Sequence, residues 1–279
     1  MILELAVGDA YGAGFEYVEE SKVRKFNNLK SYHKHPKHDV GNGKYTDDTQ
    51  MSLAIAELLI GRVDWTPLNI ANKFVEVFKR DPRKGYAGRF YEFLQEVKSG
   101  EEFLDKIHPD SDKSGAAMRA GPIGFIRNTQ EVIRYATIQA RLTHDTPSGI
   151  DSAVASALIS HYFLYNLGDK KDLGRFLESH VNGDWDKSWY GEVGSKGYMS
   201  VNAAVTAIKE CNSISEILKK CVDFTGDVDT VATIALAGAS CSREINQDLP
   251  QNLINGLENE VYGRDYIIGL DKKLKLKFK

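Results

Sequence analysis

The chain has 279 residues, of which 42% are hydrophobic and 27% are charged, a composition typical of a folded globular protein with a sizeable core. Its formal net charge of −3 gives no electrostatic basis for general binding to nucleic acid or to a membrane surface. Three cysteines without zinc-ligand spacing, no apolar run long enough to span a bilayer, and a start that lacks a basic leader predict a soluble protein of the cytoplasm.

Apolar residues recur at helical spacing along the chain, whereas the alternation typical of strands is almost absent. This pattern predicts an all-α bundle, and because no linker or internal repeat is found, one domain over residues 1–279 is expected. The expected helices are 51–60, 67–79, 88–98, 131–142, 150–167, 173–180, 200–211, 214–222, 230–240 and 251–258.

Two of these helices, 150–167 and 230–240, are apolar on nearly all sides and are expected at the centre of the bundle. The lysine-rich terminal stretch "DKKLKLKFK" is expected to be a frayed, solvated end, and the histidines of "YHKHPKHD" to lie in a solvated, mobile loop. Polar, glycine-containing pieces are expected to be the loops that carry a site, at 21–46, 106–122, 182–197 and 223–229.

The segment "LAVGDAYGAGFEY" near the start places three glycines in a helical context. Their spacing is GxxxGxG and not GxGxxG, so we expect Gly8, Gly12 and Gly14 to permit close helix packing and not to form a phosphate loop. Glu16 follows among apolar neighbours. It is either a surface acid or a buried carboxylate whose raised pKa would suit a general base.

Two short segments each place two carboxylates and a threonine hydroxyl before an expected helix. Taken alone, each is typical of helix capping, since such side chains accept bonds from free backbone N–H groups. Capping needs only one side-chain oxygen per helix end, and four carboxylates brought together without a cation would repel one another. The residues are Thr46, Asp47 and Asp48 in "YTDDTQM" and Asp227, Asp229 and Thr230 in "TGDVDTVA".

The chemistry of these side chains indicates which cation would suit them. Carboxylate and hydroxyl oxygens without histidine or cysteine favour Mg²⁺, Mn²⁺ or Ca²⁺ and disfavour zinc. Four carboxylates carry enough charge for two divalent ions, which could align vicinal oxygens of a substrate and polarise a water.

Two further segments could contact a ligand. In "SGAAMRAGPIG" (114–124), small residues would let backbone N–H groups approach a phosphate, with Arg119 as a further contact; the alternative is a tight turn between helices. In "RLTHDTPSGIDSA", His144 precedes the expected central helix, where it is either a structural hydrogen-bonding residue or a ligand contact.

The segments "GDAYGAGFE", "YTDDTQM", "SGAAMRAGPIG", "THDTPSGIDSA" and "TGDVDTVATIALAGA" occur in the order found in the ADP-ribosylglycohydrolases, which the chain resembles over nearly its whole length. The resemblance implies an all-α fold with a cleft that holds two Mg²⁺ or Mn²⁺ ions. It also implies hydrolysis of the glycosidic bond between ADP-ribose and a modified target, by a monomer that binds the ADP-ribose moiety of a modified protein.

The resemblance also implies roles for individual residues. Asp48 and Glu16 are expected to be catalytic, with Glu16 beside the attacking water. The implied metal ligands are Thr46, Asp47, Asp48, Asp227, Asp229 and Thr230. The implied substrate-binding residues are Ser114, Gly115, Ala116, Met118, Arg119, His144 and Tyr198.

Three features depart from the pattern of the family. Thr225 stands where the family often has the first of two glycines, which could change the loop beside the metals. Lys113, Ser114 and Gly115 stand where the diphosphate loop often begins Gly-Asn-Gly, and the first helix is expected to be short.

The functional hypotheses differ in linkage and in class. Removal of ADP-ribose from arginine on a protein is the first hypothesis, and serine, a nucleic-acid base or O-acetyl-ADP-ribose would be alternative targets of the same chemistry. A non-catalytic ADP-ribose-binding or crystallin-like protein and a two-metal phosphohydrolase acting on a nucleotide are the alternatives from other classes. Both acidic segments are complete, which favours an enzyme.

Overall fold

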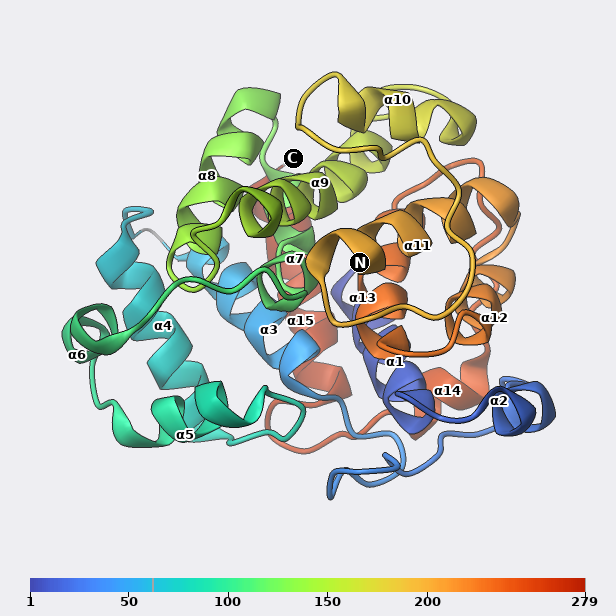
Figure 1. The fold of residues 1–279 in the computed structure, drawn as a ribbon, viewed down its shortest axis with the longest axis horizontal. Coiled ribbons are helices and arrows are strands. Elements are labelled where there is room, and N and C mark those ends of the chain that lie inside the picture. Colours follow the sequence, from blue (N-terminus) through green and yellow to red (C-terminus); the bar gives the residue numbers. More distant parts are fainter. Residues whose placement is uncertain (62, 279) are drawn as a thin grey trace.

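The computed structural model describes residues 1–61 and 63–278, and within them the regular elements are helices (Figure 1), which confirms the all-α prediction. The α-helices are α1 (Ile2–Gly12), α2 (Glu20–Phe26), α3 (Asp47–Ile60), α4 (Pro67–Arg80), α5 (Gly88–Glu96), α6 (Gly100–Lys106), α7 (Gly115–Met118), α8 (Thr129–Arg141), α9 (Pro147–Leu164), α10 (Leu173–Glu178), α11 (Gly197–Glu210), α12 (Ile214–Asp223), α13 (Val228–Ala239), α14 (Gln251–Gly256) and α15 (Arg264–Lys277). Short 3₁₀ helices are η1 (Ala13–Phe15), η2 (Gly121–Phe125) and η3 (Lys170–Asp172).

Helix α13 forms the centre of the molecule. It is buried along its whole length and packs against α1, α9, α11 and α12. Helix α9 is buried from Ser152 to Phe163 and also contacts α7 and α8. Both helices predicted to be central are therefore confirmed as such.

Glycines let α1 lie very close to α13. A Cβ atom at Gly8 would lie 2.8 Å from the carbonyl oxygen of Ala232, and one at Gly12 would lie 2.5 Å from the Cα atom of Asp229. Real Cβ atoms do not approach so closely, so the predicted role of these glycines in close packing is confirmed. The contact at Gly12 brings the end of α1 against the first turn of α13.

The two acid-bearing helices begin earlier than predicted. Helix α3 starts at Asp47, with the Thr46 hydroxyl accepting a bond from the Asp48 N–H at 3.4 Å, and α13 starts at Val228. The acids therefore lie in or next to the first helical turn instead of preceding the helix. Apolar periodicity begins only after that turn, whereas the backbone is already helical where the cap ends.

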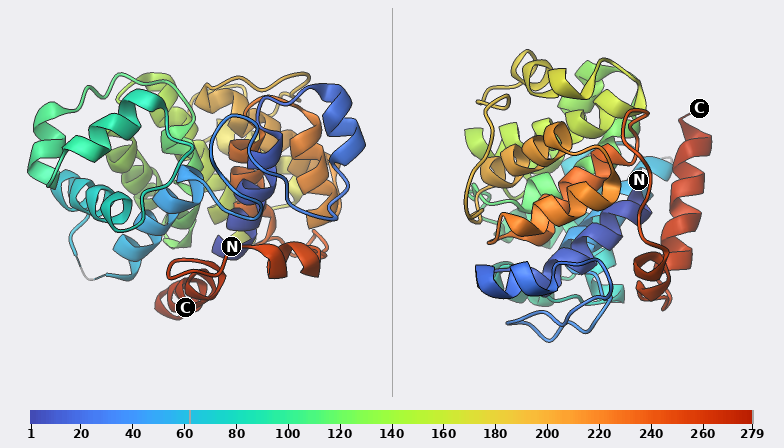
Figure 2. Two further views of the ribbon diagram at one scale, coloured as in Figure 1. Left: turned by 90° about the horizontal axis from the view of Figure 1, so that it is seen from below. Right: turned by 90° about the vertical axis from the view of Figure 1, so that its right-hand side faces the viewer.

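The C-terminal segment was expected to be frayed, and that expectation is wrong. It forms α15, whose Leu270 and Leu274 are buried and which packs against α1 and α3 along one side of the molecule (Figure 2). The lysines hide an apolar stripe at helical spacing, since long cationic side chains leave the opposite face free to pack. Helices α2 and α6 were also not predicted, and Lys279 lies outside the described residues.

The remaining helices flank this core. Helices α4 to α6 gather at one end of the molecule and α2, α12 and α14 at the other (Figure 1), and the N-terminal ends of α3 and α13 lie between the two groups. Of the helices described, none has the length and apolar character needed to cross a membrane.

Candidate metal centre

The fold brings the two acidic segments together with the residue that follows η1. Glu16, Asp227 and Asp229 each offer a carboxylate oxygen, and the three oxygens lie within 4.8 Å of one another. Asp48 also lies near this group, since its charge, after burial and the charge of Glu16, contributes to raising the pKa of Asp229. Residues 179 positions apart (227 − 48) thus share one buried acidic cluster.

Burial sets the acid–base properties of this cluster. It raises the pKa of Asp48 well above the usual value for aspartate, and the neighbouring Asp47 charge adds to this effect. Burial, and then the charge of Glu16, likewise raise the pKa of Asp229, while the pKa of Asp227 rises to about 6. The protein therefore supplies little positive charge to offset these acids.

Two of the acids also have oxygens without a partner. Asp48 Oδ2 and Asp229 Oδ1 are buried and accept no hydrogen bond from any residue that the structure describes. An unsatisfied buried oxygen is costly, and native proteins avoid it unless a ligand or ion completes the site. Since both are hard carboxylate oxygens, the residues present fit a divalent cation such as Mg²⁺ or Mn²⁺.

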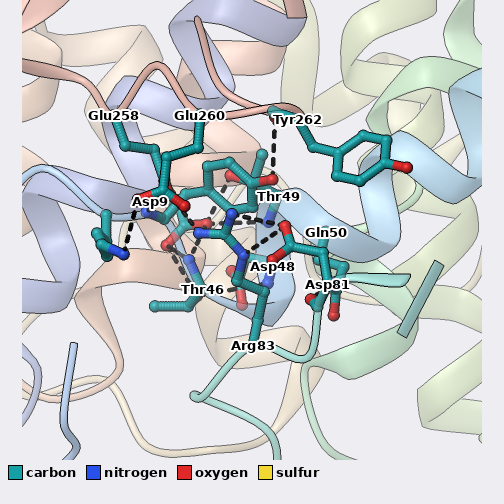
Figure 3. Close-up of polar contacts among 12 residues, drawn as sticks. Asp9, Thr46, Asp48, Thr49, Gln50, Asp81, Arg83, Glu258, Glu260 and Tyr262 are labelled. Carbon is teal, nitrogen blue, oxygen red and sulfur yellow. Dashed lines mark hydrogen bonds and ion pairs between the residues drawn. The ribbon is translucent and has the colours of Figure 1, made fainter. Parts of the chain in front are cut away.

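Asp9 organises the first turn of α3 and was not predicted (Figure 3). It is fully buried, and its carboxylate accepts the backbone N–H of Thr46 at 3.0 Å and of Thr49 at 2.9 Å. It also accepts both hydroxyls, at 2.8 Å from Thr46 and 2.6 Å from Thr49. Its place inside the apolar α1 segment was the available signal, since a lone acid there must find donors.

A buried ion pair holds the chain just before the acids (Figure 3). Arg83 pairs with Glu258, and Glu258 also accepts the backbone N–H of Tyr45 at 3.0 Å. Close by, Gly85 has φ +114°, and a Cβ there would lie 2.1 Å from Asp47 Oδ1. These contacts confine Asp47 from outside its own helix, and no sequence pattern links residues so far apart.

The predicted substrate loop lies against the second acidic segment. The Ser114 hydroxyl donates to Asp227 Oδ2 at 3.0 Å, and its backbone N–H donates to the carbonyl of Ser195 at 3.0 Å. A Cβ at Gly115 would lie 3.0 Å from the imidazole of His144. The structure therefore brings Ser114, Gly115 and His144 together beside the cluster, whereas the Ala116 and Met118 side chains are buried in α7.

The imidazole of His144 has a polar partner at Nδ1 and none at Nε2 among the described residues. Arg119 donates to the Thr143 hydroxyl at 2.8 Å, and that hydroxyl lies 2.7 Å from His144 Nδ1. Burial, with the Arg119 charge next, lowers the pKa of His144 to about 3, so the ring is neutral. Nε2 is buried without a hydrogen-bond partner among the described residues, and it carries the ring proton in the tautomer in which the Thr143 hydroxyl donates to Nδ1.

Arg119 itself was predicted to contact substrate, but its side chain is only 1% exposed. Its guanidinium donates to Gln139 Oε1 at 2.7 Å and packs over the ring of Phe74. The structure directs Arg119 into the helix packing, from which it orients His144 through Thr143.

Thr225 stands in the loop before Asp227, at the first of the departures from the family pattern. It takes φ +63°, the left-handed region that glycine enters without strain, and its carbonyl accepts the Val193 N–H at 3.0 Å. The loop keeps a glycine-like path with a β-branched residue in it, which stores strain of about 1–3 kcal/mol next to Asp227.

The histidine-rich segment "YHKHPKHD" was expected to be a solvated, mobile loop, and at His35 this expectation is wrong. His35 is only 6% exposed, and its Nε2 contacts the carboxylate of Glu16. The segment is therefore packed, at least at His35, although the surrounding lysines make it read as solvated. The exposed His38 agrees with the original expectation.

An open cavity of about 440 Å³ lies between the start of α9, the 182–189 loop and the start of α11. Trp189 and Tyr198 line it and pack edge to face, with ring centres 6.5 Å apart. Asp151 and Asn202 supply polar groups. The cavity adjoins the loop of Ser114, because Gly197 donates its N–H to the carbonyl of Asp112 at 3.1 Å.

These features define an all-α protein with a candidate divalent-cation centre at two helix N-termini. The chain belongs to the ADP-ribosylglycohydrolase family, which matches residues 1–279. A solved "ADP-ribosylglycohydrolase-related protein complex" has the same fold, with a TM-score of 0.77 at 20% identity, and the match covers 100% of this chain and 96% of that one.

Two curated relatives are similar over most of the chain. The ADP-ribosylhydrolase ARH3 of Xenopus tropicalis is 28% identical over 67% of this chain and 56% of its own length. The ADP-ribosylarginine hydrolase Tri1 of Serratia proteamaculans is 24% identical over 85% of this chain and 69% of its own. The chain thus spans little more than half of the ARH3 relative.

Proposed function

We propose that this protein is a metal-dependent hydrolase that releases ADP-ribose from modified arginine on a protein. The observation that carries the proposal is the pair of buried, unpartnered oxygens, Asp48 Oδ2 and Asp229 Oδ1, whose charged neighbours among the described residues are other acids. Membership of the ADP-ribosylglycohydrolase family supports the reaction class. The similarity to a relative named ADP-ribosylarginine hydrolase supports the arginine linkage.

The cation ligands in this proposal are Asp47, Asp48, Asp227 and Asp229, with the hydroxyls of Thr46 and Thr230. Bound Mg²⁺ or Mn²⁺ would offset the charge of the acids and fix the vicinal hydroxyls of the ribose. The Thr46 hydroxyl donates to Asp9 and accepts from Asp48, so only one of its lone pairs remains for such a contact.

The reaction would proceed by attack of water on the anomeric carbon of the ribose, while the bond from that carbon to the arginine nitrogen breaks. Asp48 or Glu16 would accept the proton of that water as the general base. Burial raises the pKa of the Asp48 carboxyl, which makes that carboxylate a better base near neutral pH. The proton taken from the water would pass to the departing guanidine, which leaves as a guanidinium. The transition state would resemble an oxocarbenium ion, as in other glycosidic hydrolyses.

The rest of the substrate would lie along the Ser114 loop. The free Nε2–H of His144 would donate to a diphosphate oxygen, beside the backbone of Gly115. The cavity lined by Trp189 and Tyr198 would take the adenine, because aromatic faces stack with a base and Asn202 can bond its edge. In this proposal Tyr198 contacts the substrate, which is the role that the family resemblance implies for it.

The test is a substrate panel in which ADP-ribose is linked to arginine, serine, a DNA base or acetate. Each is assayed with Mg²⁺, with Mn²⁺ and after chelation. We expect metal-dependent release of ADP-ribose, with arginine the preferred linkage. Normal turnover by chelated enzyme would refute the metal centre, AMP from free ADP-ribose would indicate a phosphohydrolase, and preference for serine, base or acetate would reassign the linkage.

A further inference from the structure

His35 lies beside the acidic cluster without belonging to either acidic motif. Its side chain has no exposed surface, and its Nε2 contacts Glu16 Oε2. Glu16 also offers an oxygen within 4.8 Å of those of Asp227 and Asp229. One carboxylate therefore joins the histidine to the candidate metal centre.

The backbone determines which nitrogen of His35 carries the proton. Nδ1 accepts the backbone N–H of Lys37 at 3.0 Å and that of His38 at 3.1 Å. A nitrogen that accepts these bonds has no proton of its own, so Nε2 carries the ring proton. His35 therefore donates Nε2–H to the carboxylate of Glu16.

A second metal site is the competing interpretation, because Glu16, His35 and His38 offer ligand atoms within 4.8 Å of one another. A cation at His35 Nε2 would need the lone pair of that nitrogen, while Nδ1 already uses its own lone pair for two backbone donors. The ring would then have to lose both protons. The geometry thus favours a hydrogen-bond donor over a metal ligand.

The backbone around Glu16 is held as well. The N–H of Tyr17 donates to the carbonyl of Gly226 at 2.8 Å, which ties the residue after Glu16 to the loop before Asp227. On the other side, a Cβ at Gly14 would lie 2.8 Å from the carbonyl of His33, so the two segments touch. The Glu16 side chain itself remains 20% exposed, and the His35 contact limits where it points.

We propose that His35 is a positioning residue that, by donating Nε2–H, holds the Glu16 carboxylate beside Asp227 and Asp229. The inference rests on the proposed function, in which Asp227 and Asp229 hold a divalent cation and Glu16 lies beside them. Without the donor, Glu16 is free to turn toward solvent, and loss of such a supporting contact typically weakens metal affinity or activity by about 10–100-fold.

Two substitutions separate the roles of the two ring nitrogens. His35→Asn keeps an acceptor near Nδ1 for the backbone of 37 and 38 but is too short to reach Glu16. His35→Gln keeps a donor near Nε2 and lacks that acceptor. Isothermal titration of metal-free protein with Mn²⁺ should show affinity about 10–100-fold weaker in His35→Asn, and close to that of the parent in His35→Gln.

The opposite order, or equal affinity in His35→Asn and the parent, would overturn the proposal. His35→Asn should also cost nothing further in a Glu16→Ala background, because it acts through Glu16. His38→Ala is the matched control and should bind Mn²⁺ normally. A loss in His38→Ala as large as in His35→Asn would indicate the second metal site instead.

The inference can fail separately from the proposed function. If the parent protein binds no Mn²⁺ and releases no ADP-ribose, the proposed function fails. Nitrogen NMR of the metal-free protein then still tests His35: Nδ1 should be unprotonated, Nε2 protonated, and the Nε2–H signal should move in Glu16→Ala. The opposite tautomer, or no change in Glu16→Ala, would overturn the role of His35.

Discussion

Two regions of the molecule bury a carboxylate at a helix N-terminus and use it differently. At the start of α1, Asp271 is 7% exposed and accepts the backbone N–H groups of Ile2 at 3.0 Å and Leu3 at 3.1 Å. At the starts of α3 and α13, Asp48 and Asp229 are 3% and 5% exposed, and each retains an oxygen without a partner. All three are largely buried, so the candidate site differs from the cap in having unpaired oxygens on acids whose charged neighbours are other acids.

Asp9 stands between these two cases. It caps α3 as Asp271 caps α1, but it does so inside the acidic cluster and raises the pKa of Asp47. The comparison therefore separates three tasks for a buried acid: to cap a helix, to hold a ligand, and to position the acids that hold it.

The largest effect is expected from Asp229→Asn. It removes a charge from the cluster and leaves the fold's own hydrogen bonds intact, so Mn²⁺ affinity and release of ADP-ribose should each fall at least about 100-fold. The unfolding midpoint of the metal-free variant should not fall, because repulsion with Asp48 is relieved. Calorimetric titration, the hydrolysis assay and thermal unfolding measure these quantities.

Asp271→Asn is the matched control. It should lower the free energy of unfolding by about 1–2 kcal/mol, since helix donors lose an acceptor, and leave Mn²⁺ affinity unchanged. If Asp271→Asn weakened Mn²⁺ binding and Asp229→Asn only destabilised the fold, the distinction between the two regions would be wrong.

An intermediate result is expected for Asp9→Asn, which should lower both the free energy of unfolding and the affinity for Mn²⁺. The amide places a donor against the N–H groups of Thr46 and Thr49, so the free energy of unfolding should fall by about 1–3 kcal/mol in urea titration. Mn²⁺ affinity should also weaken, because the turn that carries Asp47 and Asp48 shifts. Destabilisation with unchanged affinity would place Asp9 with Asp271 as a cap only.

The smallest effect concerns pH. Burial raises the pKa of Asp227 from 3.8 to about 6, so metal-free folded protein binds protons that the unfolded chain has released. The stability contributed by this group is fully present below about pH 4 and is lost as the pH rises through about 6. The unfolding midpoint of metal-free protein should therefore fall across this range, and added Mn²⁺ should restore it at the upper end.

Asp227→Asn supplies the reference for the pH experiment, because it removes the titrating group. The unfolding midpoint of Asp227→Asn should depend less on pH than that of the parent. The midpoint of Asp271→Asn should depend on pH as strongly as that of the parent. An equal pH dependence in Asp227→Asn and the parent would contradict the assignment.

Local patterns predicted much of the candidate site. The acids Asp47, Asp48, Asp227 and Asp229 stand next to helix starts, and a cap pattern with more carboxylates than a cap needs is visible in a few adjacent residues. The buried helices α9 and α13 were predicted for the same reason, since apolar residues on all sides are a local property.

The wrong predictions concern residues whose surroundings depend on segments far away in the chain. Lysines concealed the apolar stripe of α15, and lysines around His35 made a packed residue look solvated. Arg119 was expected at the ligand because it is charged, but its partners, Gln139 on α8 and Thr143 in the turn that follows α8, lie outside the motif. Charge predicts exposure only where the fold offers no buried partner.

The sequence by itself determined the all-α class, the two central helices and the acids at the starts of α3 and α13, because each depends on residues close together in the chain. Only the tertiary structure decided that Asp9 caps α3, that Arg83 and Glu258 hold Tyr45, and that His35 donates to Glu16. These contacts join separate segments, and a hydrogen bond between them exists only once packing has placed donor and acceptor within about 3 Å.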